Sequence, residues 1–233
     1  MKSKSTISRT RIVCCGADLL AAVVTMTVLW FAQTVLGVTP SPKESQKTNY
    51  TIFEERNTDL YFSHLTVNTY TGQVYVGAVN RIYQLSNQLA VEAVAIMGPE
   101  EDSADCPVTR NCPNVVKKPT TYYNKVLVID YVQSRLLTCG SLFQGVCAVH
   151  KLDNVSSFDS SASESVAANN ATASTVAFIA PGPTKSPKHV LYVGVSYTAN
   201  GPYRSDVPAV SSRSLDPNGK RSKPNFYQKL QWN

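Results

Sequence analysis

The stretch NKVLVIDY, residues 124–131, carries the pattern that decides the fold. Its central residues, Val126–Ile129, are all apolar, whereas a strand with one face in water alternates apolar and polar side chains. The stretch VLYV at Val190–Val193 has the same unbroken apolar character. We therefore expect both strands to be covered on both faces by neighbouring sheets.

The other segments after residue 60 also favour strands. They are rich in β-branched and aromatic residues and are separated by turn residues such as Thr71-Gly72 and Asn87-Gln88. No segment after residue 37 has a sustained helical apolar pattern longer than two turns. An all-β region is predicted, with further strands within residues 60–67, 73–85, 89–97, 135–140, 145–152, 175–180 and 189–198.

A similar strand recurs along the chain. Val74–Gly77 reads VYVG, Val126–Ile129 reads VLVI and Leu191–Gly194 reads LYVG, at intervals of 52 and 65 residues. Sheets that repeat every ~40–50 residues are typical of propeller blades, and inserted loops would lengthen the interval. Any two strands can match over four residues, so the repeat alone leaves a propeller and other all-β architectures open.

The N-terminus has the pattern of a secretory signal. Four basic residues within the first eleven precede the uncharged run Leu19–Gly37, and polar residues follow. We expect residues 1–37 to be a signal peptide cleaved after Gly37. An uncleaved anchor is the alternative, because 19 residues approach the ~20 that span a bilayer. In both cases residues 38–233 would be exported.

Charge and composition agree with an extracellular protein. Charged residues make up 16% of the chain, below the ~25% of an average soluble domain. Removing residues 1–37 takes away four basic residues and one acidic residue, which lowers the formal charge from +6 to +3. The basic excess therefore belongs mostly to the targeting segment, and we expect no nucleic-acid partner.

The cysteines fit the same compartment. Two of the six lie in the signal, and an even number in an oxidising compartment predicts two disulfides. Of the three connectivities, pairing between sequence neighbours is favoured, namely Cys106 with Cys112 and Cys139 with Cys147. Three Asn-x-Ser/Thr triplets predict N-glycosylation after export, at Asn49, Asn154 and Asn170.

No catalytic, cofactor or metal site is predicted. The chain lacks GxSxG, HExxH and Walker A strings, and its three histidines are scattered. Cys147 and His150 have zinc-ligand spacing, but a second pair at finger spacing is missing. We therefore expect no enzymatic activity.

Two segments are set apart by composition. Residues 155–175 are almost entirely Ser, Ala, Asn and Thr, so we expect a flexible surface loop. Residues 214–233 form a tail of uncertain structure. The long segment 98–121 holds the first cysteine pair, which would restrain it.

Several strings, in order, resemble a known family. VGAVNRIYQL at Val76–Leu85 is similar to the first-blade motif of plexin sema domains, and MGPEED at Met97–Asp102 is similar to the string that follows it. NKVLVIDY at 124–131, LLTCGSLFQGVC at Leu136–Cys147 and YRSDVPAVSSR at Tyr203–Arg213 also fit the plexin pattern.

The resemblance distinguishes plexins from their relatives. Semaphorins share the fold but typically have CGTNAF-x-P-x-C where this chain has CGSLFQGVC, and Gln144-Gly145 is plexin-like. The GAVNRIYQL string also fits plexins better than the hepatocyte growth factor receptor group. Residues 155–175 and the tail after Arg213 do not align, which leaves the plexin subclass open.

What the resemblance implies is a sema-type β-propeller, seven-bladed in the family. Seven blades of ~50 residues need ~350 residues, and residues 38–233 number 196. We therefore expect a partial sema domain with the first two to three blades, from a fragment or a partial gene model.

The resemblance also implies a function and a location. The expected role is the N-terminal part of a cell-surface receptor ectodomain that binds a semaphorin in guidance signalling, with co-receptor or homotypic contacts and a membrane span elsewhere in the receptor. The alternative is a secreted semaphorin-like ligand or decoy with the same fold.

Overall fold

The computed structural model describes residues 10–15, 50–56, 61–160, 164–182, 189–203 and 207–215. Its contacts separate a small unit, Arg11–Glu54, from a larger unit made of Met1–Thr10 and Glu55–Asn233. Strands β1 (Thr10–Cys15) and β2 (Tyr50–Glu55) are neighbours in a two-stranded sheet. Across the described ranges, no helix has the length and apolar character needed to cross a bilayer.

Strand β1 falls inside residues 1–37, the segment expected to be a signal peptide. The apolar run Leu19–Gly37 and its cleavage position lie outside the described residues. The signal peptide therefore stays a prediction.

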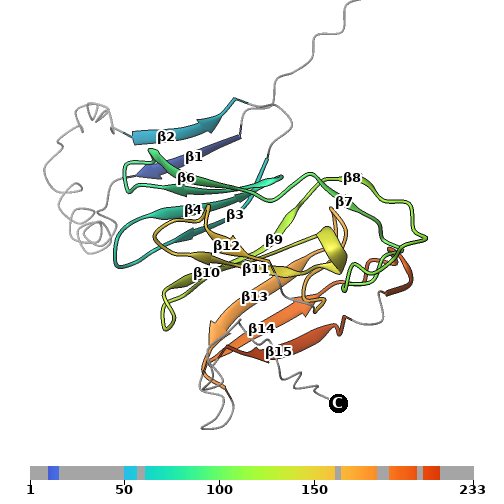
Figure 1. Ribbon diagram of the computed structural model, residues 1–233. Helices are drawn as coiled ribbons and strands as arrows, with labels where there is room; N and C mark the ends of the chain where they lie inside the picture. Colours follow the sequence, from blue (N-terminus) through green and yellow to red (C-terminus); the bar gives the residue numbers. More distant parts are fainter. Residues whose placement is uncertain are drawn as a thin grey trace, which may run out of the picture. The chain divides into compact units, whose positions relative to one another are not determined.

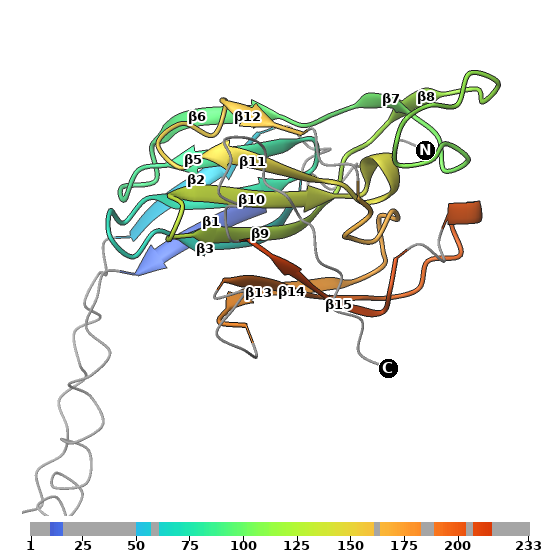
Figure 2. The same ribbon diagram turned by 60° about the horizontal axis from the view of Figure 1, so that its bottom comes forward.

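Three sheets built from consecutive strands make up most of the larger unit (Figures 1 and 2). The first has the order β3-β4-β5-β6 and the second the order β12-β11-β10-β9, so both are four-stranded meanders. The third has the order β13-β14-β15. All pairings within the three sheets are antiparallel.

The strands of the first sheet are β3 (Phe62–Val67), β4 (Val74–Ala78), β5 (Arg81–Leu85) and β6 (Val91–Ile96). Those of the second are β9 (Asn124–Asp130), β10 (Arg135–Gly140), β11 (Cys147–Lys151) and β12 (Phe158–Asp159). Those of the third are β13 (Thr175–Ala180), β14 (Val190–Val195) and β15 (Val210–Ser214).

The leading strands of the three sheets lie next to one another. β9 packs against β3 on one side and against β13 on the other. Each sheet is thus a meander that starts at the same inner edge and runs outward, as the blades of a propeller do. The prediction of an all-β region is confirmed, with a short 3-10 turn η1 (Leu142–Gln144) between β10 and β11.

The middle sheet is covered on both faces, as the apolar stretch at Val126–Ile129 predicts. Val126 and Val128 face the third sheet, and Leu127 and Ile129 face the first. The cluster towards the third sheet includes Leu137, Leu191, Val193 and Val195, and the cluster towards the first includes Tyr75, Ile82, Ala95 and Leu136.

The third sheet differs from the expectation of two covered faces. Leu191 and Val193 are buried against the middle sheet, but the opposite face carries exposed apolar side chains. Phe178 is 55% exposed and stacks on the half-buried Tyr192, with 5.3 Å between ring centroids. The described residues place no sheet over this face, although Val190 at the start of the apolar run is fully buried.

The segment 155–175 also differs from its prediction as a flexible surface loop. Val155 is fully buried in the cluster between the first two sheets, and Val166–Ala168 are buried in the cluster between the second and third. A low content of large apolar residues suggested that this segment does not pack. The structure shows why that argument fails: a few small apolar side chains are enough to fill the narrow spaces beside the sheets.

A buried ionic cluster joins the second sheet to the third. The carboxylate of Asp130 accepts hydrogen bonds from Arg135 Nε at 2.8 Å and from His189 Nε2 at 2.7 Å. It also caps the turn after β9 by accepting the N–H groups of Val132 and Gln133. Arg135 Nη2 lies 3.4 Å from the carbonyl of Leu215, the residue after β15. Leu215 is hydrogen-bonded to His189, so the cluster holds one end of the third sheet through both β14 and β15.

Candidate protein-binding surface

The segment between the first and second sheets forms a braced projection rather than an open loop. Strands β7 (Glu100–Asp102) and β8 (Lys118–Thr120) pair as an antiparallel ribbon. Beyond them Cys106 and Cys112 are joined by a disulfide, with 5.5 Å between their Cα atoms. We call residues 103–117 the disulfide loop. Because the ribbon and the disulfide both constrain the chain, the loop presents its side chains at a low entropic cost.

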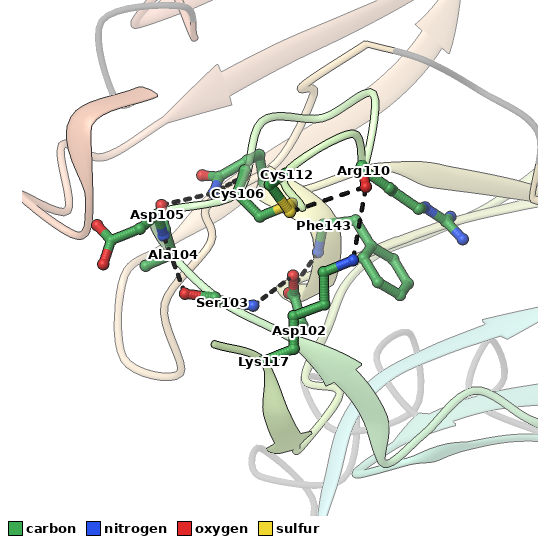
Figure 3. The surroundings of a disulfide bond; sticks show 10 residues. Asp102, Ser103, Ala104, Asp105, Cys106, Arg110, Cys112, Lys117 and Phe143 are labelled. Carbon is green, nitrogen blue, oxygen red and sulfur yellow. Dashed lines mark hydrogen bonds between the residues drawn. A yellow bond between two sulfur atoms is a disulfide. The ribbon is translucent and has the colours of Figure 1, made fainter. Parts of the chain in front are cut away.

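The turn η1 of the second sheet holds this loop in place. Asp102 Oδ2 accepts the backbone N–H of Phe143 at 2.7 Å (Figure 3). The side-chain amide of Gln144 donates to the carbonyls of Ala104 and Cys106, at 2.9 and 2.8 Å. Gln144 and Asp102 are both nearly fully buried, so these bonds are shielded from water.

An arginine and an aromatic ring meet at the tip of this arrangement. The guanidinium of Arg110 lies 3.7 Å from the centroid of the Phe143 ring (Figure 3). Arg110 is exposed, and both residues have a left-handed backbone, with φ of 61° and 51°. Such conformations are uncommon for residues with side chains and are held here by the surrounding contacts.

A cavity of about 130 Å³ lies beneath the Arg110–Phe143 pair. Its walls are about equally polar and apolar, with Glu100 and Arg110 as the charged groups. A cavity that combines apolar side chains with charged groups has the character of a site that receives one side chain of a protein partner. The apolar walls include Ile96, Met97, Tyr122, Leu142, Phe143 and Val146.

The second predicted disulfide pair lies at the base of the same turn. Cys139 and Cys147 are register partners on β10 and β11 and are joined by a disulfide, with 3.9 Å between their Cα atoms. Gly145 has a φ of 86° and allows the chain to reverse within this short closed loop. The four cysteines therefore form the two sequence-neighbour pairs.

Two of the three glycosylation triplets lie in described residues. Asn154 Oδ1 accepts from the N–H and hydroxyl of Ser156, and Asn170 Oδ1 accepts from the N–H and hydroxyl of Thr172. Asn154 is exposed and Asn170 is half-buried beside the disulfide loop. Asn49 lies outside the described residues. Glycosylation at all three stays a prediction.

The histidines are held apart by their surroundings. His150 is fully buried, and its ring nitrogens bond Thr138 Oγ1 at 2.8 Å and the carbonyl of Val155 at 2.7 Å. Cys147 is in a disulfide and both ring nitrogens of His150 are hydrogen-bonded. Neither residue therefore has a free atom with which to bind zinc. His64 lies on β3 and His189 bonds Asp130, well separated in the fold.

Burial of His150 predicts an acid-sensitive fold. Desolvation lowers the pKa of His150 to about 4, against an ordinary value of 6.5, while the bond to Val155 opposes this shift. Between pH 6.5 and about pH 4, His150 binds a proton in the unfolded chain but stays neutral in the folded chain. Stability is therefore fully present above pH 6.5 and falls as pH drops towards 4, by on the order of 3 kcal/mol from this group.

Urea unfolding at a series of pH values measures this loss. Acidic residues also titrate near pH 4, so the His150→Asn variant is the comparison. It should be less stable at neutral pH, because its shape differs, but its stability should depend less steeply on pH between 6.5 and 5. Equal slopes in the two proteins would contradict the assignment to His150.

The sequence and the structure were both compared with those of known proteins. No family model matches the chain. It is 39% identical to plexin-A2 of Homo sapiens over 137 residues, which is 58% of this chain and 7% of plexin-A2. It is 40% identical to plexin-A4 of Danio rerio over 119 residues, 50% of this chain and 6% of that protein. The solved extracellular region of plexin A4 superposes with a TM-score of 0.60 and 31% identity, over 74% of this chain and 19% of the other.

The chain is similar to plexins in sequence and in fold. Its three successive sheets agree with the first two to three blades expected of a sema-type β-propeller. The plexin-like chain spans about 7% or less of the length of the curated plexins that it matches.

The plexin-like strings turn out to be the residues that connect the blades. Asn80, in GAVNR, has a φ of 60° in the turn between β4 and β5, and its Oδ1 accepts the N–H of Tyr122 at 2.7 Å. Asp102, in GPEED, and Gln144, in CGSLFQGVC, hold the disulfide loop. The resemblance located these positions, and the structure supplies their contacts.

Proposed function

We propose that this plexin-like chain is the N-terminal part of a cell-surface receptor ectodomain that binds a semaphorin. The similarity to plexins A2 and A4 supports this proposal. Residues 1–37 would direct the chain into the secretory pathway, and residues 38–233 would form a partial sema domain on the outer side of the plasma membrane. Attachment to the membrane would come from other parts of the receptor.

The binding site proposed for this function rests on one observation: Arg110 and Phe143 are in contact and both line the same pocket. Arginine and aromatic residues beside a desolvated pocket are the groups that dominate protein interfaces. Arg110 stands on the disulfide loop, which the disulfide and the ribbon constrain, and Phe143 stands on η1, which is hydrogen-bonded to that loop. Little ordering is therefore needed on binding. We place one contact with the semaphorin here.

Surface plasmon resonance of the full-length chain over an immobilised semaphorin ectodomain tests both statements. The wild type should bind reversibly. The Arg110→Ala variant should bind about 5–10-fold more weakly, because it removes roughly 1 kcal/mol or more of an interface anchor. Lys151→Ala removes an exposed cation on β11 and should bind like the wild type.

The two outcomes that contradict the proposal are distinct. A folded chain that binds no semaphorin ectodomain would overturn the receptor function. Semaphorin binding that Arg110→Ala leaves unchanged would overturn only the placement of the contact. Circular dichroism of each variant establishes that loss of binding does not follow from unfolding.

A further inference from the structure

A second cavity, of about 300 Å³, lies where the leading strands of the three sheets begin. It is separate from the pocket beneath Arg110 and Phe143, since the two share no lining residue. One wall comes from the start of β3, one from the start of β9, and one from residues 171–176 at the start of β13. Its lining includes the polar and charged residues Ser63, His64, Lys125, Thr172, Ser174 and Thr175.

Lys125 is the unusual residue in this cavity. It is 7% exposed, and its ammonium donates to the carbonyls of Ala171 at 2.7 Å and Ala173 at 2.8 Å. No carboxylate of the described residues lies within ion-pair distance of it, and none lines the cavity. Buried lysines are rare unless they are paired with an opposite charge.

A break in strand pairing directs Lys125 to this place. Cys139 pairs with Val126 and Gly140 pairs with Asn124, so Lys125 is the extra residue of a bulge. Asn124 packs against Gly77 of the first sheet, whereas Lys125 reaches the carbonyls before the third sheet. Bulges are a common means of redirecting a side chain at a functional position.

The ammonium has one more donor than these two carbonyls accept. Lysine carries three N–H donors, and the structure shows two acceptors from the protein. The charge also acts on its neighbour: burial and then the Lys125 charge lower the pKa of His64, while bonds to Asn124 oppose this. Burial likewise lowers the pKa of Lys125, with no opposing charge to raise it. The cavity therefore has a positive field and an unmatched donor.

We propose that this cavity binds a carboxylate carried by an acidic side chain of a partner protein, with Lys125 as the ion-pairing residue. A carboxylate supplies both the missing acceptor and the missing charge. A sulfated polysaccharide would need a row of exposed cations, whereas Lys125 and His64 are the only cationic candidates in the lining. The volume accommodates one side chain and its neighbouring backbone. The proposal does not depend on the partner being a semaphorin.

The histidines make the binding measurable in the full-length chain. There are only three, so imidazole signals can be followed individually by NMR. The probe is the peptide acetyl-Gly-Glu-Gly-amide, and its Gln counterpart, which lacks the charge, is the matched control. The Glu peptide should shift the His64 signal saturably at millimolar concentration and raise the His64 pKa, because it neutralises the Lys125 charge. His150 and His189 should not respond.

Two lysine variants test whether Lys125 is the residue that binds the carboxylate. Lys125→Met should abolish the response to the Glu peptide, and Lys151→Met, on an exposed face, should preserve it. Equal shifts with the Glu and Gln peptides, or a response that persists in Lys125→Met, would overturn the proposal. The wild-type measurement decides the matter even if Lys125→Met fails to fold, because the absence of a saturable shift also overturns it.

Two small anions identify the source of the negative charge. Sodium acetate that binds as tightly as the Glu peptide would overturn the assignment to a protein side chain. Sodium sulfate that competes with the Glu peptide at equal strength would overturn the preference for a carboxylate. Weak responses to both, with a clear response to the peptide, are the expected result.

Discussion

Replacing Gly145 with alanine should destabilise the protein by more than about 3 kcal/mol, which is at the high end for a single substitution. A Cβ at this position would lie 2.0 Å from the carbonyl oxygen of Ala167, which is backbone and has no flexible end to move. The φ of 86° adds a further cost of about 1 kcal/mol for a residue with a side chain. The two costs have independent causes and act at the same site.

Relief of the clash would itself break bonds. The carbonyl of Gly145 accepts the N–H groups of Val166 and Ala167, both at 3.0 Å, so the two segments cannot separate freely. Val166 and Ala167 also belong to the cluster between the second and third sheets. We therefore expect Gly145→Ala to lower the melting temperature, measured by circular dichroism.

Gly194→Ala is the matched control. Gly194 lies on β14, has no left-handed φ, and a Cβ there would have no neighbour within 4 Å. Its stability should stay within about 0.5 kcal/mol of the wild type. If both alanine variants melt at the wild-type temperature, the tight approach of Gly145 to Ala167 is wrong.

Removal of the Asp130 carboxylate is the second large effect. In Asp130→Ala, the guanidinium of Arg135 would lose its carboxylate while remaining largely buried. His189 and the turn N–H groups of Val132 and Gln133 would also lose an acceptor. An unpaired buried charge typically costs 3–5 kcal/mol, and we expect a loss of about this size. Asp105→Ala, on the exposed disulfide loop, should change stability by less than about 0.5 kcal/mol.

A double variant separates the charge from the hydrogen bonds. Asp130→Ala combined with Arg135→Met removes both members of the ion pair and leaves no buried guanidinium. It should be more stable than the sum of the single losses predicts, by about 0.5–3 kcal/mol, in urea unfolding. Strict additivity would show that Arg135 does not depend on Asp130 in the folded state.

The fold class was within reach of the sequence because its signals are local. The unbroken apolar run at Val126–Ile129 required two covered faces, and the structure places one sheet against each. The same argument was only partly correct at Val190–Val193. An apolar strand is suited to burial on both faces, but its sequence does not show whether the described residues include a sheet on each face. The plexin-like strings supplied the propeller, which the periodicity alone left open.

The sites were less predictable because they depend on contacts between distant segments. Gln144 donates hydrogen bonds to carbonyls that lie 38 and 40 residues away in the sequence, and no local sequence pattern predicts such partners. Lys125 lies in the plexin-like string at 124–131, but the bulge that directs its ammonium arises from pairing with β10. Composition did not predict the burial of Val166–Ala168. Three small apolar residues change the average hydrophobicity of a segment very little, and yet they pack in the core cluster between the second and third sheets.

The succession of sheets has a consequence for how stability is distributed. The middle sheet gains from two neighbours, whereas the third gains from one and leaves Phe178 in water. Where each unit touches only adjacent units, cohesion adds up as in a linear array and is weakest at an unsupported terminus. Of the three described sheets, the middle one should then be the last to open, at β9 and β10.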